Sequence, residues 1–123
     1  MKWIITHNQE YNFVEIIVQG TIKAIDTVQM THEGLSLARS INSSKFLIDY
    51  SSTEVADSTM DTYGFMSNLS NIGITHQDRI SILISCNQYE HDFAETIAIN
   101  RGWSNIKYHN NREKAVAWLT KYH

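Results

Sequence analysis

The hydrophobic pattern at the start of the chain changes from an alternating period to a helical one. Two runs rich in Ile, Val, Phe and Trp, residues 3–7 and 13–19, are separated by the polar segment 8–12, and this arrangement predicts a β-hairpin. Apolar residues then recur at spacings of three and four, which predicts a first helix that ends near Ser40. Gly34 is an unfavourable residue for the interior of that helix.

The middle of the chain repeats the succession of strand and helix. The compact apolar run at residues 45–50 predicts a buried strand, because such short runs are typical of strands covered on both faces. The polar residues 51–56 predict a loop. Asp57 is a good N-cap, and apolar residues follow it at helical spacing, so a second helix is predicted to begin near Ser58 and to end at Gly73.

The last third of the chain contains the clearest strand pattern. Isoleucines alternate with other residues over the segment 79–85 and predict a strand with a buried centre. Apolar residues between 93 and 98 predict a third helix, and residues 105–108 predict a final short strand. Asn110 and Glu113 have the spacing of a capping box, which predicts the start of a fourth helix.

The predicted order of elements is ββαβαβαβα, which is typical of an α/β fold. We expect a mostly parallel five-stranded sheet with one antiparallel strand from the amino-terminal hairpin and about four helices. The chain has 123 residues, of which 42% are hydrophobic, and this is enough material for the core of one domain, residues 1–123.

Composition and charge narrow the classes of function. The formal net charge is −3, from ten Lys and Arg against thirteen Asp and Glu, and the sequence contains no extended basic run for nucleic acid. Cys86 is the one cysteine in the sequence, which favours a reducing, cytoplasmic location. No apolar stretch approaches the roughly 18–20 residues that span a bilayer, and the apolar run at the amino terminus is too short for a signal peptide.

Residues 47–60, with the sequence LIDYSSTEVADSTM, resemble the signature of STAS domains, the family that contains sulphate transporter tails and anti-sigma factor antagonists. In that family an apolar strand ending in Asp-Leu-Ser leads through a short loop to Asp-Ser-Ser-Gly at the start of a helix. The segment 18–22, VQGTI, also resembles the second strand of the family. The chain departs from the signature at Tyr50, Ser52, Thr59 and Met60.

The resemblance, which is to SpoIIAA-like members of the family, implies a regulatory protein-binding module without catalytic residues. It implies that Ser58, directly after the second Asp of the signature, is the regulatory phosphoacceptor. It also implies that the partner is a kinase or an anti-sigma-like regulator. The loop expected to contact the partner contains Asp49, Ser51, Ser52, Thr53, Glu54, Asp57, Ser58, Thr59 and Met60.

A simpler interpretation of the same residues stays open. A phosphate on Ser58 would add about −1.5 to −2 charges at the positive end of the helix dipole, which makes this position suitable for a switch. Asp57 caps the helix equally well, however, if Ser58 and Thr59 are ordinary polar residues of the first turn.

Other classes of function also stay open. A carrier similar to Sec14-type lipid-exchange proteins would hold a small apolar ligand between the sheet and the second and third helices. A hydrolase would use Ser58 or Cys86 as its nucleophile. A triad of Cys86 with His91 and Asp92 is disfavoured, because three residues so close in sequence rarely reach that geometry. Asp49 could be a phosphoacceptor as in response-regulator receivers, but the sequence lacks the acidic pair that holds Mg²⁺ in those domains.

The six histidines are scattered along the sequence, so we expect no metal and no cofactor. A homodimer is compatible with the sequence.

Overall fold

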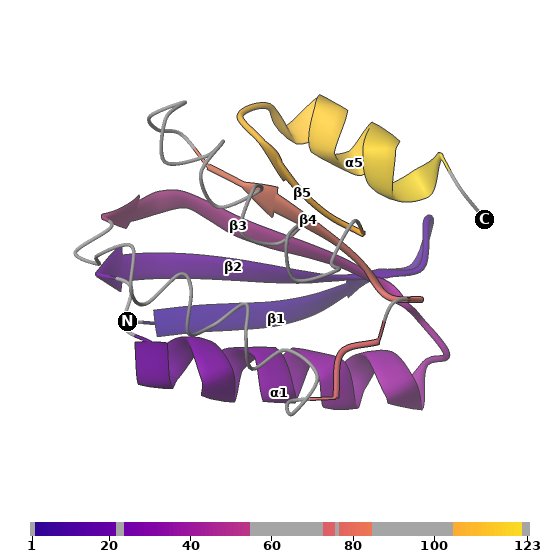
Figure 1. Cartoon of the computed structure of the whole chain (residues 1–123), viewed down its shortest axis with the longest axis horizontal. Coiled ribbons are helices and arrows are strands. Elements are labelled where there is room, and N and C mark those ends of the chain that lie inside the picture. The colour runs from indigo at the N-terminus through magenta and orange to yellow at the C-terminus, as the bar shows by residue number, and fades with distance from the viewer. Residues whose placement is uncertain (1, 22–23, 55–72, 76, 85–104, 122–123) are drawn as a thin grey trace.

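The computed structural model describes residues 2–21, 24–54, 73–75, 77–84 and 105–121, and within them the chain forms five strands and two helices (Figure 1). The strands are β1 (Lys2–Asn8), β2 (Phe13–Thr21), β3 (Lys45–Glu54), β4 (Arg79–Leu83) and β5 (Ile106–His109). The helices are α1 (Ala24–Ser40) and α5 (Arg112–Thr120), and neither has the length and apolarity needed to cross a membrane. The predicted second and third helices lie outside the described residues, except for Gly73.

The five strands form one mixed sheet in the order β1-β2-β3-β4-β5. β1 and β2 are antiparallel with an unbroken register, which confirms the predicted hairpin. β2, β3, β4 and β5 pair in parallel, each with the next strand along the chain. The prediction of a mostly parallel five-stranded sheet with one antiparallel strand is therefore confirmed.

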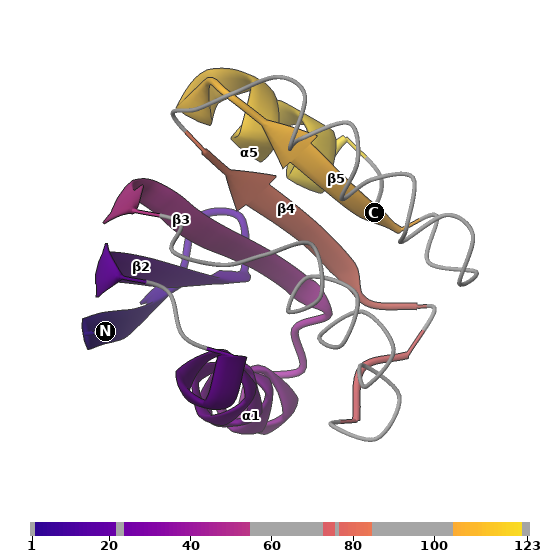
Figure 2. The same ribbon diagram turned by 60° about the vertical axis from the view of Figure 1, so that its left-hand side comes forward.

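The two helices cover opposite faces of the sheet (Figure 2). Successive residues of a strand point to opposite faces, and the two hydrophobic cores follow this rule. On the α1 side, Ile16 of β2 and Ile48 of β3 pack with Met30 of α1. On the α5 side, Phe13 and Leu47 from the same two strands pack with residues of α5, including Leu119. The central strands are thus buried on both faces, as the apolar run in β3 predicted.

The cover of the sheet is incomplete on the α5 side. α5 has nine residues and packs against β3, β4 and β5. Among the described residues, no helix packs on the same face of β1 and β2 beyond the start of α5. We call this surface the open face; the pairing of β1 with β2 places on it Lys2, Ile4, Thr6, Glu15, Ile17 and Gln19.

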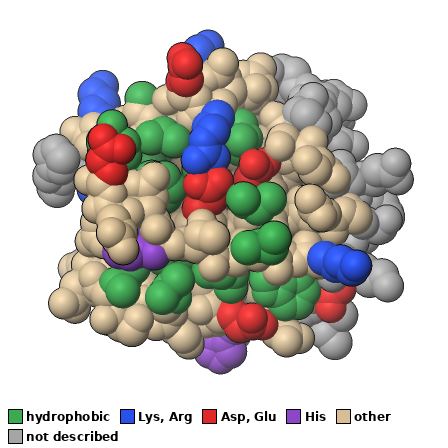
Figure 3. Space-filling view, turned by 180° about the vertical axis from the view of Figure 1, so that it is seen from behind, with side chains coloured by type: hydrophobic (Ala, Val, Ile, Leu, Met, Phe, Trp, Pro, Cys, Tyr) green, Lys and Arg blue, Asp and Glu red, His purple; other side chains and the backbone are tan. Residues whose placement is uncertain are grey.

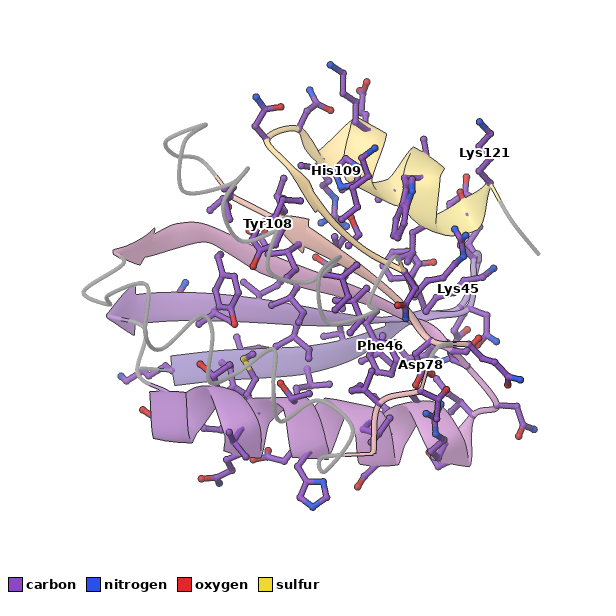
Figure 4. The ribbon with its side chains drawn as sticks, viewed as in Figure 1. Lys45, Phe46, Asp78, Tyr108, His109 and Lys121 are labelled. Carbon is purple, nitrogen blue, oxygen red and sulfur yellow. The ribbon has the colours of Figure 1, made fainter. Side chains whose placement is uncertain are left out.

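Aromatic and polar contacts fix α5 on β4 and β5. Tyr108 and His109 are adjacent on β5 and point to opposite faces of the sheet (Figure 4). The ring of His109 lies 5.8 Å from the ring of Trp118 on α5, and its Nδ1 is 2.9 Å from the hydroxyl of Ser81. The guanidinium of Arg79 lies over Trp118 at 4.9 Å from the ring centre, so the indole contacts both a histidine ring and a cation.

An ion pair joins the end of α1 to the turn before β4. Arg39 donates two hydrogen bonds to the carboxylate of Asp78, at 2.9 and 2.7 Å. Asp78 is buried and also accepts a hydrogen bond from the backbone N–H of Thr75 at 2.8 Å. The hydrogen bonds to Asp78, together with its negative charge, raise the pKa of Arg39 above its ordinary value. The entry into the central strand β4 is therefore fixed by a fully paired charge.

Two predicted boundaries are wrong. β3 continues to Glu54, so residues 51–54, predicted as part of a loop, are strand and pair with β2. The fourth helix is capped by Asn111, whose side chain accepts the backbone N–H of Lys114 at 3.1 Å, one residue later than the predicted cap at Asn110. By contrast, the first helix ends at Ser40 as predicted.

Gly34 is explained by the distance between α1 and β2. A Cβ atom at this position would lie 2.7 Å from Cδ1 of Ile16, whose side chain is buried in the core. The glycine costs about 1 kcal/mol in helix propensity relative to alanine, and it allows the helix to approach the sheet closely. The residue that looked unfavourable from the sequence is therefore a packing requirement.

We expect Gly34→Ala to reduce the free energy of unfolding, because overpacking a filled core costs about 1–3 kcal/mol and outweighs the gain in helix propensity. In an Ile16→Val background, which lacks Cδ1, the same substitution should be neutral or stabilising. Urea-induced unfolding of the four proteins in this cycle measures the coupling. Equal effects of Gly34→Ala in both backgrounds would contradict the explanation.

Candidate binding surface at the end of β3

β3 contains a bulge near its carboxyl end. Ile17 of β2 pairs with Asp49, but Gln19, two residues further along β2, pairs with Ser52, three residues further along β3. The extra residue on β3 reverses the direction in which the following side chains point, as bulges do. Ser52 is therefore placed on the same face as Asp49 and Gln19, on the α5 side of the sheet.

The carboxylate of Asp49 satisfies the backbone at the bulge. Its Oδ1 accepts the backbone N–H of Ser51 at 2.9 Å and the hydroxyl of Ser51 at 2.5 Å. This local hydrogen bond from a side chain to the backbone two residues on is a common use of Asp in turns. Ser51 and Ser52 are both exposed. The carboxyl edge of a parallel sheet, where partners and ligands of α/β proteins usually bind, thus presents a carboxylate and two hydroxyl groups.

A buried acid lies beside this group on the open face. The carboxylate of Glu15 is bound by the guanidinium of Arg112 through two parallel hydrogen bonds, both of 2.7 Å. Glu15 is only 7% exposed, so its charge needs this partner. The hydrogen bonds to Glu15 raise the pKa of Arg112, and the negative charge of Asp49 adds to the same effect. Arg112, at the first turn of α5, therefore sits in the field of acids from both β2 and β3.

The neighbouring part of the open face is hollowed. A depression of about 410 Å³ is lined by Lys2, Trp3, Ile4, Ile17 and Gln19. Ile4 keeps 60% of its surface exposed, the largest fraction among the large apolar side chains that the structure describes as exposed. Figure 3 shows hydrophobic side chains directly beside acidic and basic ones on this side of the molecule. An apolar patch with a charged rim is typical of an interaction surface.

The structure brings together part of the predicted contact loop. Asp49, Ser51 and Ser52 meet at the bulge, although they belong to a strand and not to a loop. The backbones of Thr53 and Glu54 pair with Gly20 and Thr21 of β2. The other predicted site residues lie outside the described residues, and their roles stay predictions: Asp57, Ser58, Thr59, Met60, Cys86, His91 and Asp92.

Two features of this surface were not predicted from the sequence. Glu15 is the one acid within the apolar run of β2, and a charge at such a position signals a buried partner. That partner, Arg112, is 97 residues away in the sequence, so no local pattern identifies it. The hollow requires Ile4 and Ile17 on neighbouring strands of an uncovered face. Within the described part of the chain, no group of three His, Cys, Asp or Glu side chains is arranged to hold a metal ion.

Comparisons with known proteins show the fold. No family model and no curated protein sequence matches the chain. The structure is similar to that of the anti-sigma factor antagonist SpoIIAA in its unphosphorylated form, with a TM-score of 0.60 and 9% identity over 99% of this chain and 100% of that one. It is also similar to an uncharacterized protein of the DUF3478 family with a SpoIIAA-like fold from Shewanella loihica PV-4, with a TM-score of 0.57 and 17% identity over 96% of this chain and 92% of that one. The chain therefore has a SpoIIAA-like fold, as the resemblance to STAS domains implied.

Tyr50 anchors the bulge from the α1 side of the sheet. Burial raises the pKa of its hydroxyl above the ordinary value, and a hydrogen bond with Thr27 of α1 offsets this only in part. In the unfolded chain the tyrosine loses its proton above about pH 10, while in the native state it keeps it. The stability contributed by the neutral side chain is therefore complete below pH 10 and is lost as the pH rises further.

We expect ionisation of Tyr50 in the unfolded chain to lower the free energy of unfolding by about 1.4 kcal/mol for each pH unit above pH 10. Tyr50→Phe should remove this part of the pH dependence, because phenylalanine has no proton to lose, and any effect of the lost hydrogen bond should appear equally at both pH values. Urea unfolding at pH 8 and pH 11 measures the difference, with Tyr11→Phe as an exposed control. Identical pH dependence in wild type and Tyr50→Phe would refute this.

We expect Arg112→Ala to reduce the free energy of unfolding by about 1–3 kcal/mol at neutral pH, because it leaves the Glu15 carboxylate buried without its partner. Arg112→Lys should recover part of the loss, since an ammonium restores the charge and not the two parallel hydrogen bonds. Lys114→Ala, an exposed cation on the same helix, is the matched control and should change stability by less than about 0.5 kcal/mol. Chemical unfolding compares all three, and equal effects of Arg112→Ala and Lys114→Ala would argue against a structural role for the pair.

Proposed function

We propose that this protein is a regulatory module that acts by binding another protein, in the manner of an anti-sigma factor antagonist, and catalyses no reaction. Two observations support the proposal. The fold is shared with an anti-sigma factor antagonist, SpoIIAA, over the full length of both chains. The surface at the bulge also presents exposed polar groups at the edge of the sheet where SpoIIAA-like strands lead into the signature segment of the STAS family.

The observation that carries the proposal is the bulge in β3. It turns Ser52 to the same side as Asp49 and leaves both Ser51 and Ser52 exposed. Asp49 in turn acts on Arg112, the partner of Glu15. A strand that only completed a core would have no reason to end in such a group. We infer that residues 49–66 form the contact surface, with Asp49 and Ser52 at its border with the sheet.

Control of binding by phosphorylation is the second part of the proposal. Ser58 follows the bulge by six residues and is the proposed phosphoacceptor. A phosphate there would add about −1.5 to −2 charges to a surface that already contains the carboxylate of Asp49. The added charge would repel an acidic partner and attract a basic one, so modification would change the choice or the affinity of the partner.

A small apolar ligand is a second candidate, favoured by the hollow on the open face. Its floor is formed by Ile4 and Ile17, and Lys2 at its rim would suit a ligand with a negative end. The hollow is lined by residues of β1 and β2, whereas the carrier hypothesis expects a pocket against the second and third helices, which lie outside the described residues. The exposure of Ile4 suits a surface contact better than an enclosed carrier site. The hydrolase hypothesis depends on Ser58 or Cys86, both outside the described residues, and stays a prediction.

A site-specific photo-crosslinker tests the protein-binding proposal. Benzoylphenylalanine placed at Ser52 should capture discrete proteins in extract from the native cell, because this position borders the contact surface. The same probe at Ser40, an equally exposed serine at the opposite end of the sheet, is the matched control. In the Ser52 probe, Ser58→Asp should lower the yield at least about fivefold, the ratio that about 1 kcal/mol of lost binding gives, whereas Ser58→Ala should not.

Two results would contradict this proposal. The same crosslinked proteins from Ser52 and Ser40 would show that the end of β3 is not a specific contact surface. Equal yields with Ser58→Asp and Ser58→Ala would remove the phosphorylation switch and leave only constitutive binding. Mass spectrometry of the native protein for phosphate on Ser51, Ser52, Ser58 and Thr59 identifies the modified position directly.

A further inference from the structure

β1 is the last strand at one edge of the sheet, and none of its residues is fully buried. Its side chains alternate between exposed and half-buried, whereas the adjacent β2 is buried at most positions up to Val18. Trp3 and Ile5 pack only against the margin of the core on the α1 side. Both faces of β1 therefore reach solvent, and its outer edge pairs with no other strand that the structure describes.

The two edges of the sheet differ in their protection. β5, at the other edge, has four residues with the exposed Lys107 among them, and α5 packs directly against it. Short length, a charge and a covering helix are the usual means by which proteins protect an edge strand from pairing. β1 has seven residues in an unbroken register with β2, no proline, and its one permanent charge, Lys2, at its first position. Of the two edges, β1 is the one whose backbone is suited to accept another strand.

We propose that β1 pairs in antiparallel orientation with β1 of a second copy of this chain, across a two-fold axis, so that the sheets of the two copies become continuous. An antiparallel pair of identical strands is the simplest self-complementary contact, because each residue meets its counterpart by symmetry. The backbone groups on the outer edge of β1 supply the hydrogen bonds. The inference rests on the outer edge of β1 and not on the bulge in β3, so it does not depend on the proposed function.

The length of β1 selects the register. With the axis at Ile5, all seven residues from Lys2 to Asn8 pair, and any other centre leaves residues of the strand unpaired. Ile5 then faces Ile5, and Ile4 faces Thr6 of the second copy. The two Ile4 side chains become diagonal neighbours on the open face, within reach of each other, and lose much of their exposed surface.

This register opposes no like charges. Lys2 faces the neutral Asn8 of the second copy, so the two lysines are at opposite ends of the paired strands. Trp3 faces His7 of the second copy, and the indole N–H of Trp3 donates to the carboxylate of Glu33 on α1 at 3.4 Å. The register thus sets the imidazole of His7 opposite the indole of Trp3 twice, once on each side of the axis. Like charges directly opposite each other would disfavour the pairing, and this register contains none.

Sedimentation of the purified chain over about 1–500 µM tests the inference, because a two-fold dimer must show mass action. We expect a monomer–dimer equilibrium. Ile4→Lys should raise its dissociation constant at least about tenfold, because it replaces the apolar contact at the axis with two neighbouring charges. Val28→Lys, which changes an exposed apolar residue of α1 that is not on β1, should leave the dissociation constant unchanged.

Cysteine crosslinking tests the register. In a Cys86→Ser background, Ile5→Cys should form an intermolecular disulfide, because directly opposed residues in antiparallel strands have Cα atoms about 4.5–5.5 Å apart. Thr6→Cys should not, because its two copies lie two positions apart along the strands. A monomer at every concentration, a dimer unaffected by Ile4→Lys, or crosslinking at Thr6→Cys in place of Ile5→Cys would overturn the proposal.

Discussion

Burial of the central strands by hydrophobic cores on both faces of the sheet is the constraint from which the other features of this structure follow. Ile16 and Ile48 point to one core while Phe13 and Leu47 point to the other, so a shift of any central strand by one residue would place apolar side chains on the wrong face. The register of the central sheet is therefore determined by packing on both sides. The close approach of α1 at Gly34 belongs to the same requirement.

The unequal reach of the two helices determines where the surface is available for binding. α5 is short and packs mainly on β3 to β5, and beyond Phe13 the adjacent face of β1 and β2 receives, among the described residues, the side chain of Arg112 from its first turn. Its guanidinium pairs with the carboxylate of Glu15, which would otherwise be a buried charge without a partner. Beyond it, Ile4 and Ile17 form a hollow that no described helix fills. β1, whose residues are exposed or half-buried, is the edge of the described sheet on that side.

The bulge in β3 connects this architecture to the proposed regulatory role. A regular strand would turn Ser52 toward α1, whereas the extra residue turns it toward the side of Asp49 and Arg112. On the opposite face the half-buried Tyr50 packs against the core on the α1 side, with a hydrogen bond between its side chain and Thr27. The polar end of β3 is thus part of a paired strand and not of a loop, so the first part of the signature segment, up to Glu54, has the geometry of the sheet. A partner at this end and a second copy at β1 would use different edges of one sheet.

Local pattern in the sequence was sufficient for the elements whose side chains alternate or repeat with a clear period. The hairpin, the first helix to Ser40, the strand beginning at Arg79 and the class of the sheet were all predicted from it, and the resemblance of residues 47–60 to STAS domains implied the SpoIIAA-like fold. Hydrophobic periodicity reports which face of an element is buried, and this is a property of neighbouring residues. Asp49, Ser51 and Ser52 could be predicted as surface residues for the same reason.

The features that tertiary structure decided depend on residues far apart in the sequence. The polar residues 51–54 have no strand pattern of their own, and they are strand because β2 supplies backbone partners across the bulge. The pairing of Glu15 with Arg112, the hollow under Ile4 and the exposure of β1 follow from the order of strands and from how far α5 extends. A sequence of 123 residues specifies these contacts, but only the folded chain brings their members together.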